Sequence, residues 1–375
     1  MITLRFEQQL DQFVLNIDAT IPATGITAIF GRSGAGKTSV INAISGLKNP
    51  TSGRIAKGDQ VLFDSELGIN QPIEKRNIGY VFQEARLFPH YKVKGNLLYG
   101  VKGKIEANKF NQVVELLDLS SLLNRYPADL SGGEKQRCAI ARALLSEPDI
   151  LLMDEPLASL DLPRKQEVMP FLERLSSEVN IPILYVTHSM DEILHLADHM
   201  LLIEDGRVKE AGDIETLWRS PSLAAWHNTN ELSTLFKGRV KHTHNHYSVT
   251  YVELAPQVGV WMSGIQAQAE EILRIRIHAS DVSITLEHAS NTSIRNILPA
   301  TVVKVAEVSD ASAPVSVLLR LQHDESTVDN NSQDLCLWAN ITAWAYDDLK
   351  LQTGQLVYAQ IKGVRLTNKD MARKG

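Results

Sequence analysis

The hydrophobic pattern of the first 230 residues is typical of an α/β fold. Short, largely apolar runs alternate with longer segments whose apolar residues recur at helical spacing. Continuous apolar runs are the mark of strands buried on both faces, as in a parallel sheet with helices on either side. The pattern predicts strands at residues 26–30, 149–153 and 183–186, and helices at residues 37–47, 135–145 and 164–179.

Two other segments extend this α/β core. Residues 84–130 read mainly as helix, with an amphipathic stretch at 110–117, and are predicted to form an inserted helical subdomain. The N-terminal segment instead alternates apolar and polar residues, which predicts an antiparallel pair of strands. The alternating apolar residues are Ile2, Leu4 and Phe6, then Phe13, Leu15 and Ile17.

After about residue 231 the pattern changes to short strand-like runs separated by polar loops, which predicts an all-β unit. Residues 324–333 contain no core-forming side chains and are predicted to be a solvated loop. The predicted strands cover residues 249–252, 273–277, 301–305 and 357–361.

Length, charge and cysteine spacing narrow the range of possible functions. The 375 residues allow two or three compact units. The net charge is -6, and charged residues of both signs are spread along the chain, so nucleic acid is not a predicted partner. Cys138 and Cys336 have neither disulfide-framework nor zinc spacing. Residues 1–15 lack the layout of a signal peptide, and no run approaches the roughly 20 apolar residues that span a bilayer. We expect a cytoplasmic protein that meets a membrane only through a partner.

A glycine-rich segment between the first predicted strand and helix matches the P-loop pattern. Its glycines let successive amides curl around phosphates, and the helix N-terminus adds positive potential. Lys37 is predicted to reach the β- and γ-phosphates, and the Thr38 hydroxyl to bind magnesium. A plain glycine-rich turn is the alternative, which the strand–helix context disfavours. The segment comprises Gly31, Arg32, Ser33, Gly34, Ala35, Gly36, Lys37 and Thr38.

Asp154 and Glu155 follow the second predicted strand, at the carboxyl edge of the sheet. Such a pair alone is more often a solvated turn or a helix cap. Beside a P-loop, Asp154 is predicted to hold magnesium through water, and Glu155 to orient and deprotonate an attacking water.

The chain resembles the ABC ATPase family over about residues 1–230, because five motifs occur in that family's order. The signature motif at residues 130–134 (LSGGE, followed by KQR) separates this family from other P-loop proteins. The other matches are the P-loop, Gln83, the pair Asp154–Glu155 with Asp161 after it, and His188. The predicted fold class is therefore an α/β P-loop ABC ATPase domain with a helical subdomain, followed by an all-β domain.

The resemblance implies that the signature residues act on a second copy of the chain. Ser131, Gly132 and Gly133 begin a helix, and their amides form a second anion site. In the family this site clamps the γ-phosphate of ATP held by the partner's P-loop. The implied assembly is a head-to-tail dimer with two composite sites.

The resemblance also assigns roles to single side chains. Gln83 would touch magnesium and sense the γ-phosphate, His188 would contact that phosphate, and Asp161 would meet the partner's P-loop region. The family usually stacks adenine on an aromatic side chain ahead of the P-loop, and here Phe6 and Phe13 are available.

Two segments indicate a particular ABC subgroup. Residues 86–90 (RLFPH) resemble the importer region that docks a cytoplasmic helix of the membrane subunit, although plain core packing is an alternative. Residues 293–299 (SIRNILP), the strand at 300–305 and the strand ending near residue 362 resemble the OB-related, molybdate-binding Mop-like domain. Together these features resemble the ATP-binding subunits of bacterial molybdate importers. The predicted boundaries are 1–230, 231–290, 291–363 and 364–375.

The Mop-like segment also contains candidate ligands for molybdate. A tetrahedral dianion needs several donors and positive charge, which Ser293, Arg295, Asn296 and Lys362 can supply. The alternative is that these residues only support barrel packing or a dimer contact. A bound anion would act as feedback, provided that it favours one conformation over another.

The sequence therefore predicts an ATPase that uses ATP and Mg2+ and drives molybdate import. Its expected partners are a second copy, membrane permease subunits and, indirectly, a periplasmic or extracellular oxyanion-binding protein, at the cytoplasmic face of the cell membrane. Tungstate, sulfate or a sugar remain alternative cargoes. A soluble ABC ATPase acting on nucleic acid would require a coiled-coil insertion or two ATPase halves, and the sequence has neither.

Overall fold

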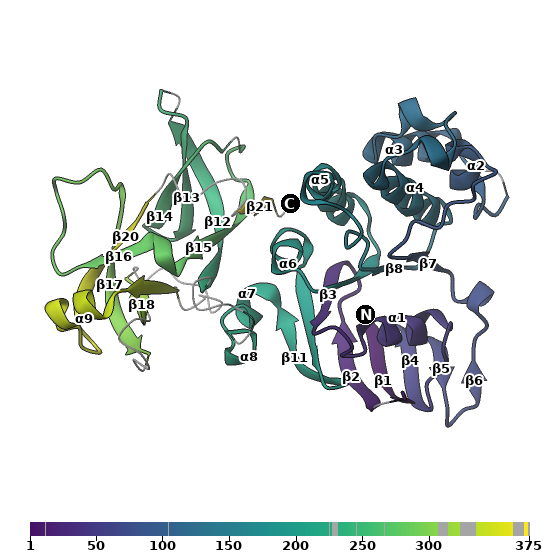
Figure 1. Cartoon of the computed structure of the whole chain (residues 1–375), viewed down its shortest axis with the longest axis horizontal. Helices are drawn as coiled ribbons and strands as arrows, with labels where there is room; N and C mark the ends of the chain where they lie inside the picture. The colour runs from purple at the N-terminus through teal and green to yellow at the C-terminus, as the bar shows by residue number, and fades with distance from the viewer. Residues whose placement is uncertain are drawn as a thin grey trace. The chain divides into compact units, whose positions relative to one another are not determined.

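The structure is a computed structural model. It describes residues 1–375 except 12, 104, 225, 227–231, 245, 266, 307–313, 323–334, 363–370 and 374–375, so the predicted loop at 324–333 lies outside the described residues. Contacts within the chain divide it into two units, Met1–Ile214 and Glu215–Gly375. Figure 1 labels the helices and strands of both units.

A single mixed sheet runs through the N-terminal unit. Among the described residues its eleven strands follow the order β6-β5-β4-β1-β2-β11-β10-β3-β9-β8-β7. The strands are β1 (Ile2–Gln9), β2 (Val14–Ile21), β3 (Gly25–Gly31), β4 (Ser52–Lys57), β5 (Gln60–Asp64), β6 (Ile69–Asn70), β7 (Ile78–Val81), β8 (Ile150–Asp154), β9 (Pro182–Thr187), β10 (His199–Glu204) and β11 (Arg207–Asp213).

The two halves of this sheet have the patterns predicted for them. β1 and β2 pair antiparallel along their whole length, which confirms the predicted N-terminal pair. β10, β3, β9, β8 and β7 are neighbouring parallel strands. Every residue of β9 is buried, as expected for a parallel strand covered on both faces.

Helices of the N-terminal unit include the three predicted beside the parallel strands, which the structure confirms to within a few residues. They are α1 (Lys37–Ser45), α2 (Val93–Leu98), α3 (Ala107–Leu116), α4 (Gly132–Leu145), α5 (Leu162–Glu178) and α6 (Met190–Leu196), with 3-10 turns η1 (Ile73–Lys75), η2 (Ser120–Leu122) and η3 (Pro127–Asp129). No helix among the described residues is long and apolar enough to cross a membrane.

The segment at 84–130 is less helical than predicted. Its described α-helices are α2 and α3, with the 3-10 turns η2 and η3 after them. Residues 88–92 form a non-helical loop. The buried Asn96 side chain explains that loop, because its amide accepts from the Phe88 N–H at 2.7 Å and donates to the carbonyls of Phe88 and Tyr91, each at 3.0 Å. A polar side chain that bonds backbone groups in this way competes with helix formation.

Two five-stranded sheets make up most of the C-terminal unit within the described part of the chain, in the orders β14-β13-β12-β15-β21 and β16-β20-β17-β18-β19. The strands predicted in this unit are confirmed. The elements are α7 (Ile214–Leu217), α8 (Pro221–Ala224), β12 (Ser233–His244), β13 (Val249–Ala255), β14 (Val258–Ser263), β15 (Ile272–His278), η4 (Ala279–Asp281), β16 (Val282–Thr285), β17 (Asn296–Val305), β18 (Val315–Leu321), β19 (Cys336–Ile341), α9 (Ala343–Leu349), β20 (Leu356–Ile361) and β21 (Met371–Arg373).

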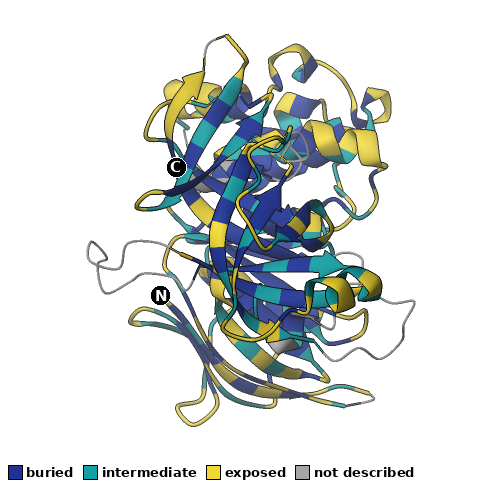
Figure 2. Ribbon diagram, turned by 90° about the vertical axis from the view of Figure 1, so that its left-hand side faces the viewer, coloured by how far each residue is buried: buried dark blue, intermediate teal, exposed yellow. Residues whose placement is uncertain are grey.

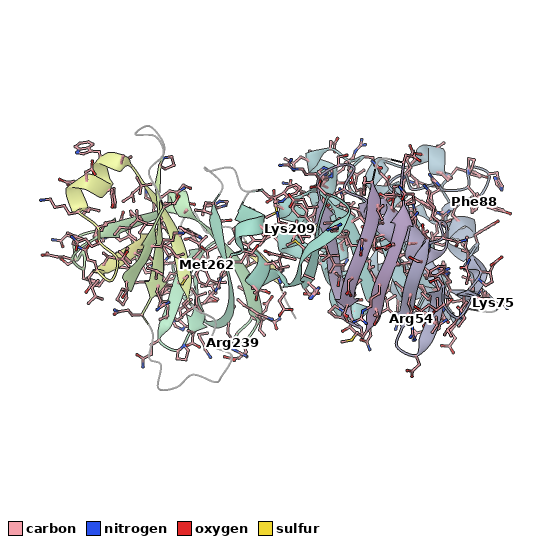
Figure 3. The ribbon with its side chains drawn as sticks, turned by 90° about the horizontal axis from the view of Figure 1, so that it is seen from below. Arg54, Lys75, Phe88, Lys209, Arg239 and Met262 are labelled. Atoms are coloured by element: carbon pink, nitrogen blue, oxygen red, sulfur yellow. The ribbon has the colours of Figure 1, made fainter. Side chains whose placement is uncertain are left out.

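Both sheets of the C-terminal unit contribute to one hydrophobic core, which contains Val260 and Met262 of β14 together with Val317 and Leu319 of β18. Figure 2 shows buried residues along the strands, and Figure 3 labels Met262 within the unit and Arg239 at its edge. The contacts divide the chain after Ile214, whereas the predicted boundary lies at residue 230. The inner boundaries at 290 and 363 stay predictions.

A buried ion pair ties the start of the C-terminal unit to its sheet. Glu215 of α7 accepts two hydrogen bonds on Oε1 from Arg274 of β15, at 2.9 Å from Nε and 2.7 Å from the terminal nitrogen. The two side chains are only 9% and 2% exposed. Nearby, the Trp218 indole N–H donates to the Ser233 hydroxyl at 3.2 Å. These contacts explain why the residues after Ile214 belong to the C-terminal unit.

Substitution of Arg274 by Met should destabilise the C-terminal unit by about 3–5 kcal/mol, because it leaves the Glu215 carboxylate buried without its partner. All five tryptophans follow residue 214, so urea unfolding monitored by tryptophan fluorescence reports on this unit. Arg239→Met is the matched control, since Arg239 is exposed and its ion pair with Glu270 lies in solvent. An unchanged unfolding midpoint for Arg274→Met would contradict the role assigned to the pair.

Candidate nucleotide site

Four neighbouring parallel strands bring the predicted nucleotide-site residues to one edge of the sheet. Phe30 of β3 pairs with Thr187 of β9, Val186 of β9 with Asp154 of β8, and Met153 of β8 with Val81 of β7. Because parallel strands end at a common edge, the residues that follow them lie together there. Those residues are the P-loop, His188, Glu155 and Gln83.

The P-loop presents an uncapped helix start at this edge. α1 begins after Gly36, whose φ of 101° is in the left-handed region that favours glycine. The helix has no side-chain cap at its N-terminus and no acidic residue in its first turn, so its first amides are available to an anion. Arg32, Ser33, Gly34 and Thr38 are exposed, Gly36 is half-buried, and Gly31, Ala35 and Lys37 are buried.

Lys37 is a buried cation held across the loop that precedes it. Its Nζ donates to the carbonyls of Gly31 at 2.9 Å and Arg32 at 3.0 Å. The side chain is 5% exposed, and Nζ lies 3.9 Å from Glu155 Oε1. Burial lowers the pKa of Lys37, while the charges of Glu155 and Asp154 oppose that shift. The arrangement places positive charge where the loop would meet a phosphate.

Thr38 and Asp154, two of the predicted magnesium ligands, touch each other. The Thr38 hydroxyl donates to Asp154 Oδ1 at 2.9 Å. Burial is the main cause of a raised pKa of Asp154. The Thr38 hydrogen bond and the nearby Tyr80 hydroxyl oppose that shift, whereas the charge of Glu155 adds to it. Adjacent hydroxyl and carboxylate oxygens are hard ligands of the kind that Mg2+ binds. The residues present therefore fit this ion.

Tyr80 of β7 also lies at this edge, although no motif in the sequence includes it. Its hydroxyl donates to Asn42 Oδ1 at 3.0 Å and lies 3.5 Å from Asp154 Oδ2. Burial, followed by the Asp154 charge, raises the pKa of Tyr80 well above its ordinary value. No sequence signal identifies this residue, because only the pairing of β7 with β8 brings it to Asp154.

Glu155 lies at the centre of the charged groups. Its φ of 43° is unusual for a residue with a side chain, and backbone strain of this kind often occurs at functional sites. The Glu155 N–H donates to the Val186 carbonyl at 3.1 Å, which fixes it to β9. Its Oε2 lies 3.2 Å from His188 Nδ1. The structure thus brings Glu155, His188 and Lys37 together.

The signature residues lie elsewhere in the unit. Ser131 caps α4, which Figure 1 shows beside α2 and α3 and away from α1. Ser131 and Glu134 form a capping box, in which the Ser131 hydroxyl accepts from the Glu134 N–H at 3.3 Å and the Ser131 N–H donates to Glu134 Oε2 at 2.6 Å. The S-x-x-E spacing is visible in the sequence, so this cap could have been predicted.

The signature glycines allow close packing against the segment that carries Asp161. A Cβ on Gly132 would lie 2.9 Å from Leu160 Cδ2, and one on Gly133 would lie 3.3 Å from Val168 Cγ2. Asp161 itself caps α5, where its Oδ1 accepts from the Arg164 N–H at 3.1 Å. Gln83 is exposed and follows β7.

The two candidate adenine contacts differ in exposure. Phe6 is 3% exposed and belongs to the core under the N-terminal strands. Phe13 is half-buried, and its ring lies 3.6 Å from the position that a Cβ on Gly36 would take. Of these two candidates, Phe13 is the one with a partly accessible ring beside the P-loop.

The candidate anion ligands of the C-terminal unit are partly brought together. Asn296 pairs with Ile361, so Arg295 and Lys362 adjoin just beyond that pair, and both are exposed, as is Ser293. Asn296 is 2% exposed. Its amide accepts from the Trp261 N–H at 2.7 Å and donates to the Trp261 carbonyl at 2.9 Å. The Asn296 side chain therefore joins β17 to β14 rather than pointing toward solvent.

Comparisons with known proteins give a family match in each of the two units. The ABC transporter family matches residues 14–158, and the TOBE domain family matches residues 292–367. The chain is 53% identical over 371 residues to the molybdenum import ATP-binding protein ModC of Vibrio parahaemolyticus, covering 99% of this chain and 98% of that one. It is 51% identical over 377 residues to ModC of Aliivibrio fischeri, covering 100% of each.

A solved structure resembles the N-terminal part. CbiO1 of Clostridium perfringens, described as part of the ABC transporter complex cbiONQ, is 26% identical, with a TM-score of 0.52. The match covers 60% of this chain and 93% of that one.

Proposed function

This chain belongs to the ModC family of molybdenum import ATP-binding proteins, and from that membership we propose that it hydrolyses ATP to drive molybdate import. The observation that carries the proposal is the convergence of Lys37, Glu155 and His188 beside the Thr38–Asp154 pair. Phosphoryl transfer needs positioning and electrostatic stabilisation above all, and this edge of the sheet supplies both.

Each side chain has a role consistent with its position. Lys37 and the first amides of α1 bind the phosphates. Glu155 orients a water and takes its proton, and its contact with His188 aligns its carboxylate toward the γ-phosphate position. Thr38, Asp154 and Gln83 would hold Mg2+, which supplies positive charge to the polyphosphate when bound. Phe13, beside Gly36, would stack on the adenine.

A second copy of the chain completes each site. Ser131, Gly132 and Gly133 form a helix start away from their own P-loop, so they would serve a nucleotide on another chain. Asp161, next to that helix start, would reach the partner's P-loop region. The proposed assembly is a head-to-tail dimer in which binding of ATP closes the interface and hydrolysis reopens it.

Aromatic side chains in the segment 86–99 suit the docking of a membrane permease helix. Phe88 packs against Tyr91 and Tyr99, with ring centroids 6.1 and 4.1 Å away, and both tyrosines are exposed. The hydrogen bonds of Asn96 hold this loop in shape. We propose that the dimer lies at the cytoplasmic face of the cell membrane, bound to permease subunits. An oxyanion-binding protein would deliver the oxyanion to those subunits.

The exposed donors of the C-terminal unit support a regulatory anion site. Arg295 and Lys362 adjoin where β17 begins and β20 ends, with Ser293 close in sequence. Asn296 would support the site by fixing β17 rather than by touching the anion. Cytoplasmic molybdate bound here would slow ATP turnover.

Replacement of Glu155 by Gln should abolish steady-state ATP hydrolysis while nucleotide binding persists, because the amide cannot accept a proton from water. Phosphate release and the dissociation constant for MgATP are the two measurements. Glu74→Gln, at an exposed carboxylate outside the site, is the control. Normal turnover of the Glu155 variant would exclude it as the base.

Composite sites predict complementation between two inactive variants. Ser131→Arg should block closure of the dimer, and Lys37→Ala should weaken nucleotide binding, so each alone lacks ATPase activity. A mixture should recover activity, since a mixed dimer has one site with an intact P-loop and an intact signature. If the mixture stays inactive while mixed dimers form, each chain contains its own complete site.

Replacement of Arg295 by Ala should weaken molybdate binding by the full chain and leave basal ATPase activity unchanged. Isothermal titration with molybdate, tungstate and sulfate measures the affinity and compares the alternative anions. Arg320→Ala, on the exposed face of β18, is the control. Equal molybdate affinity in the wild type and the Arg295 variant would remove Arg295 from the site.

A further inference from the structure

A buried carboxylate lies behind the turn that carries His188. Glu192 of α6 is 5% exposed. Its Oε2 accepts from the Thr187 hydroxyl at 2.7 Å and the Tyr185 hydroxyl at 3.0 Å, both on β9. Its Oε1 accepts from Lys165 Nζ of α5 at 3.3 Å. One carboxylate thus joins three elements.

The β9 side of this network is attached to the groups that face the nucleotide. Thr187 directly precedes His188, and its hydroxyl also accepts from the Ser189 N–H at 3.0 Å. Ser189 in turn caps α6 by accepting from the Glu192 N–H at 3.3 Å. On the other side of Thr187, the Val186 carbonyl accepts from the Glu155 N–H. The position of this turn therefore sets both His188 and Glu155.

The α5 side is attached to the residues proposed to meet the partner chain. Lys165 lies in the first turn of α5, whose cap is Asp161. Val168, one turn farther along, is the residue against which Gly133 of the signature packs. Movement of α5 would therefore shift Lys165 and change its contact with Glu192.

The energetics favour a positioning role over simple packing. A buried carboxylate is costly unless several donors compensate it, and an apolar side chain of similar size would be stabilising at lower cost. Hydrogen bonds to a charged acceptor are stronger and more directional than neutral ones. The three donors at Glu192 therefore favour the arrangement of the turn at residues 187–189 in which all of them are bonded.

We propose that Glu192 is a positioning residue, which holds the His188 turn in its catalytic geometry and links it to α5. The proposal rests on the proposed function, namely ATP hydrolysis by Glu155 and His188. Glu192 is buried behind the turn and bonds Thr187, Tyr185 and Lys165, so it acts through the turn.

Glu192→Gln and Thr187→Val test the proposal in the full-length chain. Gln at position 192 keeps the shape of the side chain, but its NH2 group faces a donor (Lys165, Thr187 or Tyr185) in place of an acceptor oxygen. Val at position 187 removes the hydroxyl with little change of shape. Both should lower kcat by roughly ten- to a hundredfold, the effect of a small misplacement of catalytic groups, and leave the dissociation constant for MgATP unchanged. A purely structural role would lower the unfolding midpoint without lowering kcat per folded molecule.

Glu173→Gln is the matched control. Glu173 Oε1 lies 3.0 Å from His195 Nδ1, so this pair joins the same two helices farther along. Its loss should leave kcat unchanged. An equal loss of kcat in Glu173→Gln and Glu192→Gln would mean that helix packing alone, not the His188 turn, explains the effect, and would overturn the proposal.

A double-mutant cycle with His188→Ala separates this inference from the function on which it rests. If Glu192 acts through the turn, Glu192→Gln should lower kcat less in the His188→Ala background than in the wild type. If kcat of the double variant is lowered by the product of the two single losses, Glu192 acts independently of His188, which would overturn the proposal. Unchanged kcat in His188→Ala alone would instead refute the catalytic role of His188, a failure of the proposed function that the cycle reveals separately.

Discussion

Parallel pairing of β3, β9, β8 and β7 determines where the nucleotide-site residues of the N-terminal unit lie. Strands that run in one direction end at one edge, and every residue that follows them is delivered to the same place. Apolar residues within the strands supply the burial that holds the sheet together. The charged residues just beyond the strands are excluded from that core, so they collect at its edge. Lys37, Glu155 and His188 meet there for this reason.

Several residues serve folding and chemistry at once. Ser131 and Asp161 cap α4 and α5, which satisfies backbone amides that would otherwise lack partners. The same caps set where each helix begins, and hence where its first amides point. Gly132 is needed for contact with Leu160, independently of any bound phosphate. Substitutions in these motifs therefore affect stability as well as catalysis, and the two effects must be measured separately.

Buried polar groups specify how the elements of each unit fit together. Glu215 with Arg274, and Asn296 with the Trp261 backbone, each join two elements of the C-terminal unit at one defined register. Glu192 does the same for β9, α5 and α6 in the N-terminal unit. Hydrophobic packing is tolerant of small shifts, whereas a buried polar group left without its partner is costly. These contacts therefore fix positions that apolar packing alone leaves adjustable.

Elements and motifs that depend on residues close together along the chain could be predicted from the sequence. The P-loop needs its glycines, Lys37 and Thr38 within eight consecutive positions, and the buried strands are continuous apolar runs, so both are visible along the chain. Residues 84–130 contain less helix than the apolar pattern predicts. At residues 88–92 the Asn96 side chain bonds the backbone of a loop that this pattern does not reveal.

Contacts between residues far apart along the chain could not be predicted from the sequence, because they depend on how the segments pack. The order of strands in the sheet brought Tyr80 to Asp154, and the packing of α5 and α6 on β9 brought Lys165 to Glu192. The same packing buried Phe6 but left Phe13 accessible, and it directed the Asn296 amide to Trp261. These outcomes depend on pairing between segments far apart along the chain. Hydrophobic periodicity and motif spacing act over short stretches, so they specify each segment but not its neighbours in space.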